Sequence, residues 1–372
     1  MIAIPQRYRL FLLNVAITLS ISCATVHAAT YYVATTGSDS NPGTLDNPWR
    51  NPQKCATSPI QAGDICIVRG GTYGDPTRQG VVVYIRKNSP SGTTSQPITI
   101  KSEVPLGAKM VIPSSINGAN AAFYITQPYY IVEGFDITGG DLDGDVVSYA
   151  GIVFTSSATG GIARFNSIHH IGRTICSNSA YGFSGILVGG TANVVIEHNQ
   201  LYSIGRLRNG ENGCSTTKNQ HDHGVYLAGS SNLIVRRNIF YDTNRGWPIH
   251  VYKSGGTTTD LYIYHNTFDG RSPTGKPAGH ILLANSIKGA YIKNNISSDA
   301  QTGMINAYAL TASGVTVSHN LSDTLEKTGL SLAGVTFSQN IQRSTNLGFI
   351  DKSRNDFRLT SASAAVNRGT KD

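Results

Sequence analysis

Residues 185–205 read GILVGGTANVVIEHNQLYSIG: an apolar run, a Gly-rich turn, and a second apolar run that surrounds Asn199. The same phrase of apolar residues, Asn and apolar residues recurs at Asn166, Asn238, Asn266, Asn295, Asn320 and Asn340. Successive copies are 20 to 39 residues apart. A short constant core with insertions of variable length is typical of a solenoid whose loops lie on one side.

From Ile65 onward, short stretches alternate β-branched or aromatic residues with polar ones, and helical periodicity is nearly lacking. We therefore expect an all-β chain wound as a parallel β-helix, with long loops on one face. Each repeated Asn is expected at a bend between two strands. Stacked Asn side chains would form a hydrogen-bonded ladder that satisfies backbone groups at the bends. These asparagines are therefore interpreted as structural residues rather than catalytic ones.

The start of the chain has the pattern of a secretory signal. Arg7 and Arg9 precede the apolar stretch LFLLNVAITLSIS, and small residues follow up to Ala28. The stretch is too short and too interrupted for a membrane span. We expect removal of residues 1–28 and a secreted or periplasmic protein. Residues 29–372 are expected to form one domain, with 29–64 as an N-terminal cap and 345–372 as a C-terminal partial coil.

Charge and cysteine content narrow the choice of partner and compartment. The chain carries 30 basic and 22 acidic residues, a balance of +8, which suits an anionic polysaccharide but also serves solubility. Nucleic acid is disfavoured, because the sequence has no dense Lys/Arg run. Four cysteines follow the signal, and nearness in sequence predicts the disulfides Cys55–Cys66 and Cys176–Cys214.

The strands that follow the long insertions align as GIVF at 151–154, GILV at 185–188, GVYL at 224–227, PIHV at 248–251 and HILL at 280–283. Side chains alternate along a strand, so the second and fourth residues of each copy are expected inside. The third residue then faces outward. Adjacent coils lie about 4.8 Å apart, which predicts that Tyr226 and His250 are neighbours on one outer face.

Tyr226 and His250 are the centre of a predicted functional cluster. The expected catalytic side chains are Tyr226, His250, Lys253 and His223, and the expected substrate-binding side chains are His221, Arg245, Trp247, Tyr252, His280, Arg206 and Arg208. The two longest insertions, near 173–181 and 206–220, enter the same region and carry Cys176 and Cys214. A disulfide between them would make a rigid, positively charged wall.

These residue types suit β-elimination of a uronate polymer. That reaction needs a cation or donor at the carboxylate, a base for the C5 proton and an acid for the departing oxygen. Tyr226 and His250 would supply the acid and the base, with Lys253 or Arg245 near the carboxylate. Hydrolysis needs two carboxylic acids across one bond. The outward face near Tyr226 offers only Asp222, which argues against a hydrolase.

A calcium site is predicted at Asp141, Asp143 and Asp145, because alternating Asp and Gly residues supply the oxygen ligands that Ca²⁺ prefers. The segment lacks the distal Glu of a helix–loop–helix calcium site, so an acidic turn is the alternative interpretation.

The phrases YYVATTGSDSNPGTLDNPW at 31–49 and GDICIVRGGTY at 63–73 resemble the start of right-handed parallel β-helix polysaccharide lyases, which include pectate, alginate and chondroitin lyases. The resemblance covers most of the mature chain and implies a right-handed parallel β-helix. Residues 238–256 are similar to the coil on which alginate and chondroitin lyases carry a catalytic Lys, which implies Lys253 as base. Their calcium ligands would fall on Gly246 and Pro248 and their Arg near Ala284, so neither is carried over. HDHG at 221–224 resembles an Asp/His motif of β-helix alginate epimerases.

The sequence therefore predicts a secreted, monomeric lyase of an acidic polysaccharide such as pectate or alginate, with Ca²⁺ as the one cofactor considered. Two alternatives stay open: a polyuronate C5-epimerase and a non-catalytic glycan-binding protein. An epimerase changes stereochemistry without creating an unsaturated end, and a binding protein shows affinity without turnover.

Overall fold

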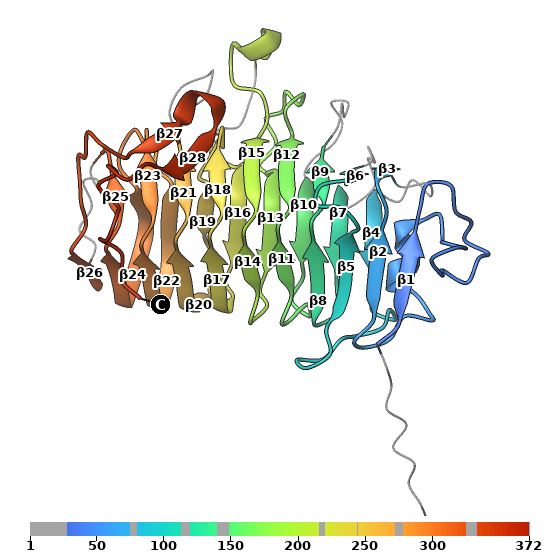
Figure 1. Ribbon diagram of the computed structural model, residues 1–372. Helices are drawn as coiled ribbons and strands as arrows, with labels where there is room; N and C mark the ends of the chain where they lie inside the picture. The colour runs from blue at the N-terminus through green and yellow to red at the C-terminus, as the bar shows by residue number, and fades with distance from the viewer. Residues whose placement is uncertain are drawn as a thin grey trace, which may run out of the picture.

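The computed structural model describes residues 28–74, 80–112, 120–139, 149–215, 220–243, 245–271, 278–324 and 333–371. Within these ranges the chain forms stacked parallel strands that progress from the N-terminal end to the C-terminal end of one solenoid (Figure 1). Helical structure in the described ranges is limited to the 3-10 turns η1 (Pro52–Ala56), η2 (Glu211–Gly213) and η3 (Lys352–Arg354). None of these could cross a membrane. The expected all-β parallel β-helix is confirmed, and the predicted signal at 1–28 lies almost wholly outside the described residues.

The strands form three ladders, here called faces 1, 2 and 3. Face 1 contains β4 (Val81–Ile85), β7 (Asn120–Ile125), β10 (Tyr149–Phe154), β13 (Ser184–Gly189), β16 (His223–Ala228), β19 (Ile249–Val251) and the first parts of β22 (Ile281–Lys293) and β24 (Ile305–Ser318). Face 2 contains β1 (Thr30–Val33), β2 (Ile65–Val68), β5 (Ile98–Ser102), β8 (Tyr130–Glu133), β11 (Ile162–Arg164), β14 (Val195–Glu197), β17 (Ser231–Arg236), β20 (Thr257–Tyr264), the second parts of β22 and β24, and β26 (Val335–Ser338). Asn285, with a φ of 62°, marks the corner at which β22 passes from face 1 to face 2.

Face 3 is the 9-stranded sheet. It contains β3 (Gly71–Tyr73), β6 (Ala108–Val111), β9 (Asp136–Thr138), β12 (Ser167–Ile171), β15 (Gln200–Ile204), β18 (Ile239–Tyr241), β21 (Thr267–Asp269), β23 (Ile296–Ser298) and β25 (Leu321–Ser322). From β8 onward, each of these strands follows its face 2 strand after a turn of two residues, as from Glu133 to Asp136 and from Glu197 to Gln200. This turn has the same length in every such coil, so it fixes how faces 2 and 3 meet.

The interior of the solenoid is apolar because alternate side chains of each strand point into it. On face 1 the predicted inward residues are all fully buried: Ile152, Phe154, Ile186, Val188, Val225, Leu227, Ile249, Val251, Ile281 and Leu283. Facing strands add Phe240 and Phe268, whose rings stack with centroids 5.1 Å apart. Each buried aliphatic side chain contributes roughly 1.5–3 kcal/mol through removal of apolar surface from water. The inward and outward assignment made from the sequence is therefore confirmed.

The predicted asparagine ladder is present at the two-residue turns. From Asn166 to Asn320, each backbone N–H donates to the side-chain oxygen of the next ladder Asn at 2.9–3.0 Å. Each side-chain amide donates to the same oxygen at 2.9–3.1 Å. The residue before each ladder Asn, for example Arg237 with a φ of 55°, adopts the left-handed conformation although it is not Gly. The ladder holds this unfavourable backbone in place.

The two ends of the solenoid differ. At the N-terminal end, β1 pairs with β2 and the buried Trp49 stacks on Tyr31. At the C-terminal end, β27 (Phe349–Asp351) and β28 (Asp356–Leu359) form an antiparallel hairpin. The expectation of a partial coil at 345–372 is therefore wrong for this stretch, because η3 and the left-handed Asn355 (φ 60°) reverse the chain. Both predicted disulfides, Cys55–Cys66 and Cys176–Cys214, are present.

Candidate active site

A groove of about 830 Å³ lies on the outer side of face 1. It is lined by side chains of face 1 and by the loops that lead into it: Ala180, Tyr181, Gly182, Ser184, Leu187, Gln220, His221, His223, Tyr226, Trp247, His250, Tyr252, Leu282, Asn306, Ala307 and Tyr308. The predicted cluster therefore lies in a concave site. Six of the eleven predicted catalytic and substrate-binding residues are in this lining.

The floor of the groove is one row of outward side chains on successive strands. Strand pairing places Leu187 opposite Tyr226, Tyr226 opposite His250, and His250 opposite Leu282, and the row continues to Asn306. The rings of Tyr226 and His250 meet edge to face with centroids 5.1 Å apart. The expectation that these two side chains are vertical neighbours on one outer face is confirmed.

His223 and His250 form a chain of hydrogen bonds that starts at the backbone. The N–H of Trp247 donates to Nδ1 of His223 at 3.3 Å. In the neutral ring Nε2 of His223 therefore carries the proton, and it donates to Nδ1 of His250, 2.9 Å away. The remaining proton of His250 is then on Nε2. That atom is buried and has no hydrogen-bond partner among the described residues.

Burial keeps these two imidazoles neutral. The pKa of His250 is lowered to about 4, first by burial and then by the nearby charge of His221. The pKa of His223 is lowered well below its usual range by the same two kinds of cause, burial and the charge of His250. Burial raises the pKa of Tyr226, and Tyr252 adds to the effect. At neutral pH the His250 ring thus carries its N–H on a buried nitrogen, and Tyr226 keeps its O–H.

His221 has the opposite tautomer. Its Nδ1 lies 2.9 Å from the carbonyl oxygen of Ala180, which can only accept a hydrogen bond. Nδ1 therefore carries the proton of the neutral ring, and Nε2 keeps its lone pair. Close backbone contacts fix the position of the segment that carries His221 and Asp222. A Cβ on Gly182 would lie 1.7 Å from the His221 carbonyl oxygen, and one on Gly246 would lie 2.2 Å from that of Asp222.

Arg206 was expected to bind substrate, and its position contradicts this. Its side chain is 1% exposed, and its five N–H groups have partners inside the protein. Nε and Nη2 donate to the buried carboxylate of Asp222. Nη1 and Nη2 also donate to the carbonyl oxygens of Ser177, Ser179 and Tyr181. Arg206 therefore shapes the loop that forms the groove wall, instead of facing the groove.

Arg245 and Arg208 also lie behind the wall. Arg245 is 2% exposed at its side chain and donates to both carboxylate oxygens of Glu211 at 2.8 Å. Arg173 donates to the same carboxylate at 2.9 Å, so Glu211 joins two cations. Arg208 is half-buried and lies outside the groove lining. The Cys176–Cys214 disulfide links the two loops as predicted. The charges of Arg206 and Arg245 are paired inside the wall and do not face the groove, contrary to the predicted positive wall.

His280 and Lys253 are also outside the groove lining. His280 is fully buried, stacks on Phe268 with centroids 5.3 Å apart, and shares a 2.8 Å hydrogen bond between Nδ1 and Ser297 Oγ. It precedes the first residue of β22 and its side chain turns inward, which corrects its predicted role in binding substrate. Lys253 is exposed, and its side chain lies against Gly229 and Gly256 at the face 1 to face 2 corner.

The sequence interpretation missed three contributors to the groove. Asn306 continues the outward row by one strand, and its side-chain oxygen accepts a 2.8 Å hydrogen bond from the Trp247 indole N–H. Tyr181 and Tyr308 are 68% and 64% exposed. Extending the alignment to INAY at 305–308 would have found Asn306 and Tyr308. No sequence pattern identifies Tyr181, which lies in an irregular loop.

The predicted calcium ligands Asp141, Asp143 and Asp145 lie outside the described residues. In the ranges that are described, no group of three or more His, Cys, Asp or Glu side chains could hold a metal ion. Calcium takes six to eight oxygen ligands, usually including carboxylates. The described groove lining supplies no carboxylate, so its side chains do not fit this ion.

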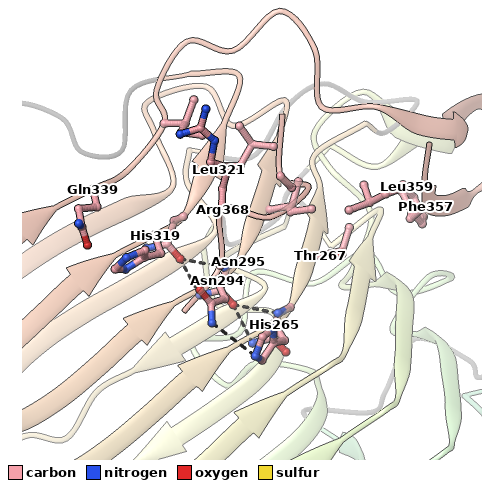
Figure 2. A pocket seen from close by; sticks show the side chains of 16 residues that line it. His265, Thr267, Asn294, Asn295, His319, Leu321, Gln339, Phe357, Leu359 and Arg368 are labelled. Atoms are coloured by element: carbon pink, nitrogen blue, oxygen red, sulfur yellow. Dashed lines mark hydrogen bonds between the residues drawn. The ribbon is translucent and has the colours of Figure 1, made fainter. Parts of the chain in front are cut away.

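A second hollow of about 280 Å³ lies between the two-residue turns of the last coils and the C-terminal tail (Figure 2). His265, Asn294 and His319 line it, and each occupies the left-handed position before a ladder Asn. The Asn294 side chain donates to the Thr370 carbonyl at 2.8 Å and accepts from its N–H at 3.0 Å. These contacts attach the tail to the coils. His265 lies in the turn between faces 2 and 3, away from the row of Tyr226 and His250 on face 1.

Comparison with known proteins supports the fold assignment. Residues 184–351 match the family model "Right handed beta helix region". An alginate lyase from Paenibacillus sp. strain FPU-7 is 15% identical, with a TM-score of 0.52 over 84% of this chain and 95% of that one. A pectate lyase is 17% identical, with a TM-score of 0.53 over 92% of both chains. Comparison with curated proteins finds no match. The chain is therefore a right-handed parallel β-helix, and its resemblance to the β-helix polysaccharide lyases is confirmed at the level of the fold.

Proposed function

We propose that the protein is a polysaccharide lyase that cleaves a uronate-containing polysaccharide by β-elimination in the face 1 groove. A base removes the proton at C5, the bond between C4 and the glycosidic oxygen breaks, and a double bond forms between C4 and C5. The departing oxygen takes up one proton. One proton leaves carbon and one reaches oxygen, so the reaction consumes neither water nor an oxidant.

The observation that carries this proposal is the pattern of imidazole tautomers beside a free phenol. Of the three imidazoles that line the groove, His221 is the one whose tautomer leaves an unprotonated nitrogen without a described partner. Its Nε2 is therefore the proposed base. A general base needs a lone pair within reach of the proton that it removes. This assignment replaces the sequence-based expectation that His250 is the base.

Tyr226 is the proposed acid. Its raised pKa keeps the phenol protonated at neutral pH. The hydroxyl forms no hydrogen bond with the described part of the chain, so its proton is available to a ligand in the groove. Tyr226 also lies in the row between Leu187 and His250, at the middle of the groove floor. Transfer of its proton to the glycosidic oxygen completes the elimination, and solvent then restores the phenol.

His250 is proposed to stabilise the substrate carboxylate as negative charge builds up at C5. The ring lines the groove, and its Nε2–H has no described acceptor; because this nitrogen is buried, the proposed contact requires the ring to turn toward the substrate. A donor in this position lowers the energy of an enolate-like transition state. His223 acts as a positioning residue, because its hydrogen bond fixes the tautomer of His250. Since Lys253 lies outside the lining, we assign it no step.

The test is a panel of pectate, alginate, glycosaminoglycans and bacterial exopolysaccharides, followed by the ultraviolet absorbance of the unsaturated product. Product from at least one polymer is expected. Tyr226→Phe and His221→Gln should each lower kcat by at least about 100-fold while the folded structure is retained. Tyr291→Phe, on exposed face 2, is the matched control. Full activity in Tyr226→Phe would remove the proposed acid and, with it, the mechanism.

The same panel separates the alternatives. An epimerase would invert C5 without any absorbance change, which nuclear magnetic resonance of the polymer detects. A glycan-binding protein would retain affinity and give neither signal. A predicted calcium requirement through Asp141, Asp143 and Asp145 is checked by adding a chelator to the active reaction, followed by restoration with Ca²⁺.

A further inference from the structure

The described lining of the groove contains no Asp, Glu, Lys or Arg. Its polar groups are three imidazoles, four tyrosine hydroxyls, one indole N–H, two side-chain amides and one serine hydroxyl. Burial holds His250 and His223 in the neutral form at neutral pH. The groove therefore offers many hydrogen-bonding groups but no permanently charged side chain. This is unusual for a site that binds an anionic polymer, because the chain as a whole has a net charge of +8.

Three arginines of the nearby loops are paired with carboxylates, with Asp242 also 3.8 Å from Arg245, whereas the exposed Lys253 beside Tyr252 lies outside the lining. Arg206 is paired with Asp222, and Arg173 and Arg245 share Glu211. These ions are largely buried in the wall, where each carboxylate offsets the charge of its Arg partners. They stiffen the loops that carry Tyr181 and His221 without adding a positive potential at the floor. The wall thus separates these three arginines from the substrate.

A polymer of consecutive uronates would place a carboxylate at every sugar in such a groove. Each carboxylate that leaves water without a cation costs several kcal/mol unless hydrogen bonds replace its hydration. The hydroxyl of Tyr226 and the buried Nε2–H of His250 lie together at the middle of the floor, without hydrogen-bond partners among the described residues. One carboxylate can be accommodated there once the imidazole turns outward, whereas the flanking Tyr181 and Tyr308 each offer a single hydroxyl.

Exposed aromatic rings mark those flanking positions. Tyr181 belongs to the loop that leads into β13, and Tyr308 is on β24, so the two rings lie toward opposite ends of the row of strands. Both rings are about two-thirds exposed, at 68% and 64%. A flat ring presents apolar area to the C–H face of a pyranose while its hydroxyl stays in water. Such a surface binds a sugar ring without requiring a charge on it.

We infer that the substrate is a heteropolysaccharide in which an isolated uronate, bound at Tyr226 and His250, is flanked by neutral sugars that stack on Tyr181 and Tyr308. This inference rests on the proposed lyase function and gives its substrate class. It disfavours pectate and alginate, the polyuronates that the sequence suggested.

The experiment compares two probes: a bacterial exopolysaccharide with one glucuronate per repeat of neutral hexoses, and polygalacturonate. Both turnover and binding are measured from about 0.05 to 0.5 M NaCl, a range in which screening changes strongly. We expect kcat/KM for the heteropolymer to exceed that for polygalacturonate by at least about 10-fold, and its KM to change less than about 2-fold with salt. A preference for polygalacturonate, or a KM that rises steeply with salt, would overturn the inference while leaving the lyase intact.

Binding by calorimetry separates this inference from the proposed function. If neither probe gives unsaturated product, the lyase proposal fails for these substrates, but salt-insensitive binding of the heteropolymer alone still upholds the neutral-flank inference. Tyr181→Ala and Tyr308→Ala should raise KM for the heteropolymer by about 5-fold or more with kcat retained, since they remove binding that is equal in ground and transition states. Tyr291→Ala, an exposed face 2 tyrosine, is the control. Leu187→Lys, on the floor, should raise affinity for polygalacturonate, and no gain would contradict the argument from charge.

Discussion

His250 and His280 have nearly the same local chemistry in two different places. Each has one partnered ring nitrogen, His250 with His223 and His280 with Ser297. Each has a buried Nε2 without a hydrogen-bond partner in the described chain, and a pKa lowered by burial, to about 4 and about 3. Yet His250 is on the outward side of β19 and lines the groove, whereas His280 turns into the core. A buried, unpaired imidazole therefore does not identify a site by itself, and the side of the coil decides its role.

The largest expected difference between the two residues is in turnover. His250→Ala should lower kcat by about 100-fold to 10,000-fold, because it removes the donor at the substrate carboxylate. His280→Ala should leave kcat within about 2-fold, since its ring contacts Phe268 and Ser297 rather than the groove. Steady-state kinetics on folded protein measures both. Equal losses of kcat in the two variants would contradict the assignment of His250 to the groove and His280 to the core.

For the free energy of unfolding, we expect His280→Ala to have a larger effect than His250→Ala. His280→Ala should lower the free energy of unfolding by roughly 2–4 kcal/mol, because it leaves a cavity beside the buried Phe268. His250→Ala removes a ring at the groove, where water can fill the space, so its cost should be smaller. Urea denaturation of both variants provides the values. A larger loss from His250→Ala would show that the groove histidine is the structural one.

Acid should destabilise the protein through both imidazoles. A His with a lowered pKa binds its proton less tightly when folded than when unfolded, and the unfolded pKa is about 6.5. The free energy of unfolding is therefore unaffected above that pH and falls as the pH drops from about 6.5 toward 4, by on the order of 1 kcal/mol per pH unit for each residue. His280→Gln should remove its own share of this slope, on the order of 1 kcal/mol per pH unit, in urea titrations at several pH values; His223, whose pKa is also lowered, keeps its share. An unchanged slope would mean that His280 is not the titrating group.

The smallest expected effect is that of Ser297→Ala. It removes the hydroxyl that faces Nδ1 of His280 and should cost roughly 1 kcal/mol. Turnover should not change. The matched variant at the groove is His223→Ala, which removes the partner of His250 Nδ1 and should lower kcat more than it changes KM. If Ser297→Ala were to lower kcat as strongly as His223→Ala, the core and groove histidines would be coupled, against the present interpretation.

The parts of the molecule that repeat were predictable from sequence. Alternation fixed the inward residues, and the stacked phrase around Asn199 gave the ladder and the neighbours Tyr226 and His250. Residues outside the repeated strands could not be placed from the sequence. His280 precedes its strand, and Arg206 lies in an insertion, so parity could not show that one turns inward and the other pairs with Asp222. The tautomers of His221 and His250 depend on carbonyl and imidazole partners far away in sequence, which no local pattern reveals.

The coils keep a constant length at one corner and vary at the other two: the connection from face 1 to face 2 has 2 residues between Ala228 and Ser231 and 12 between Ile85 and Ile98. The turn from face 2 to face 3 keeps two residues in every coil from β8 onward, whereas the return from face 3 to face 1 has 7 residues from Tyr241 to Ile249 and 18 from Ile204 to His223. Added residues at this return lengthen the rim above the groove and leave the vertical alignment of the floor unchanged. Such a scaffold allows selectivity and chemistry to be altered separately, so grafting a new rim loop is the natural way to redirect this protein to another glycan.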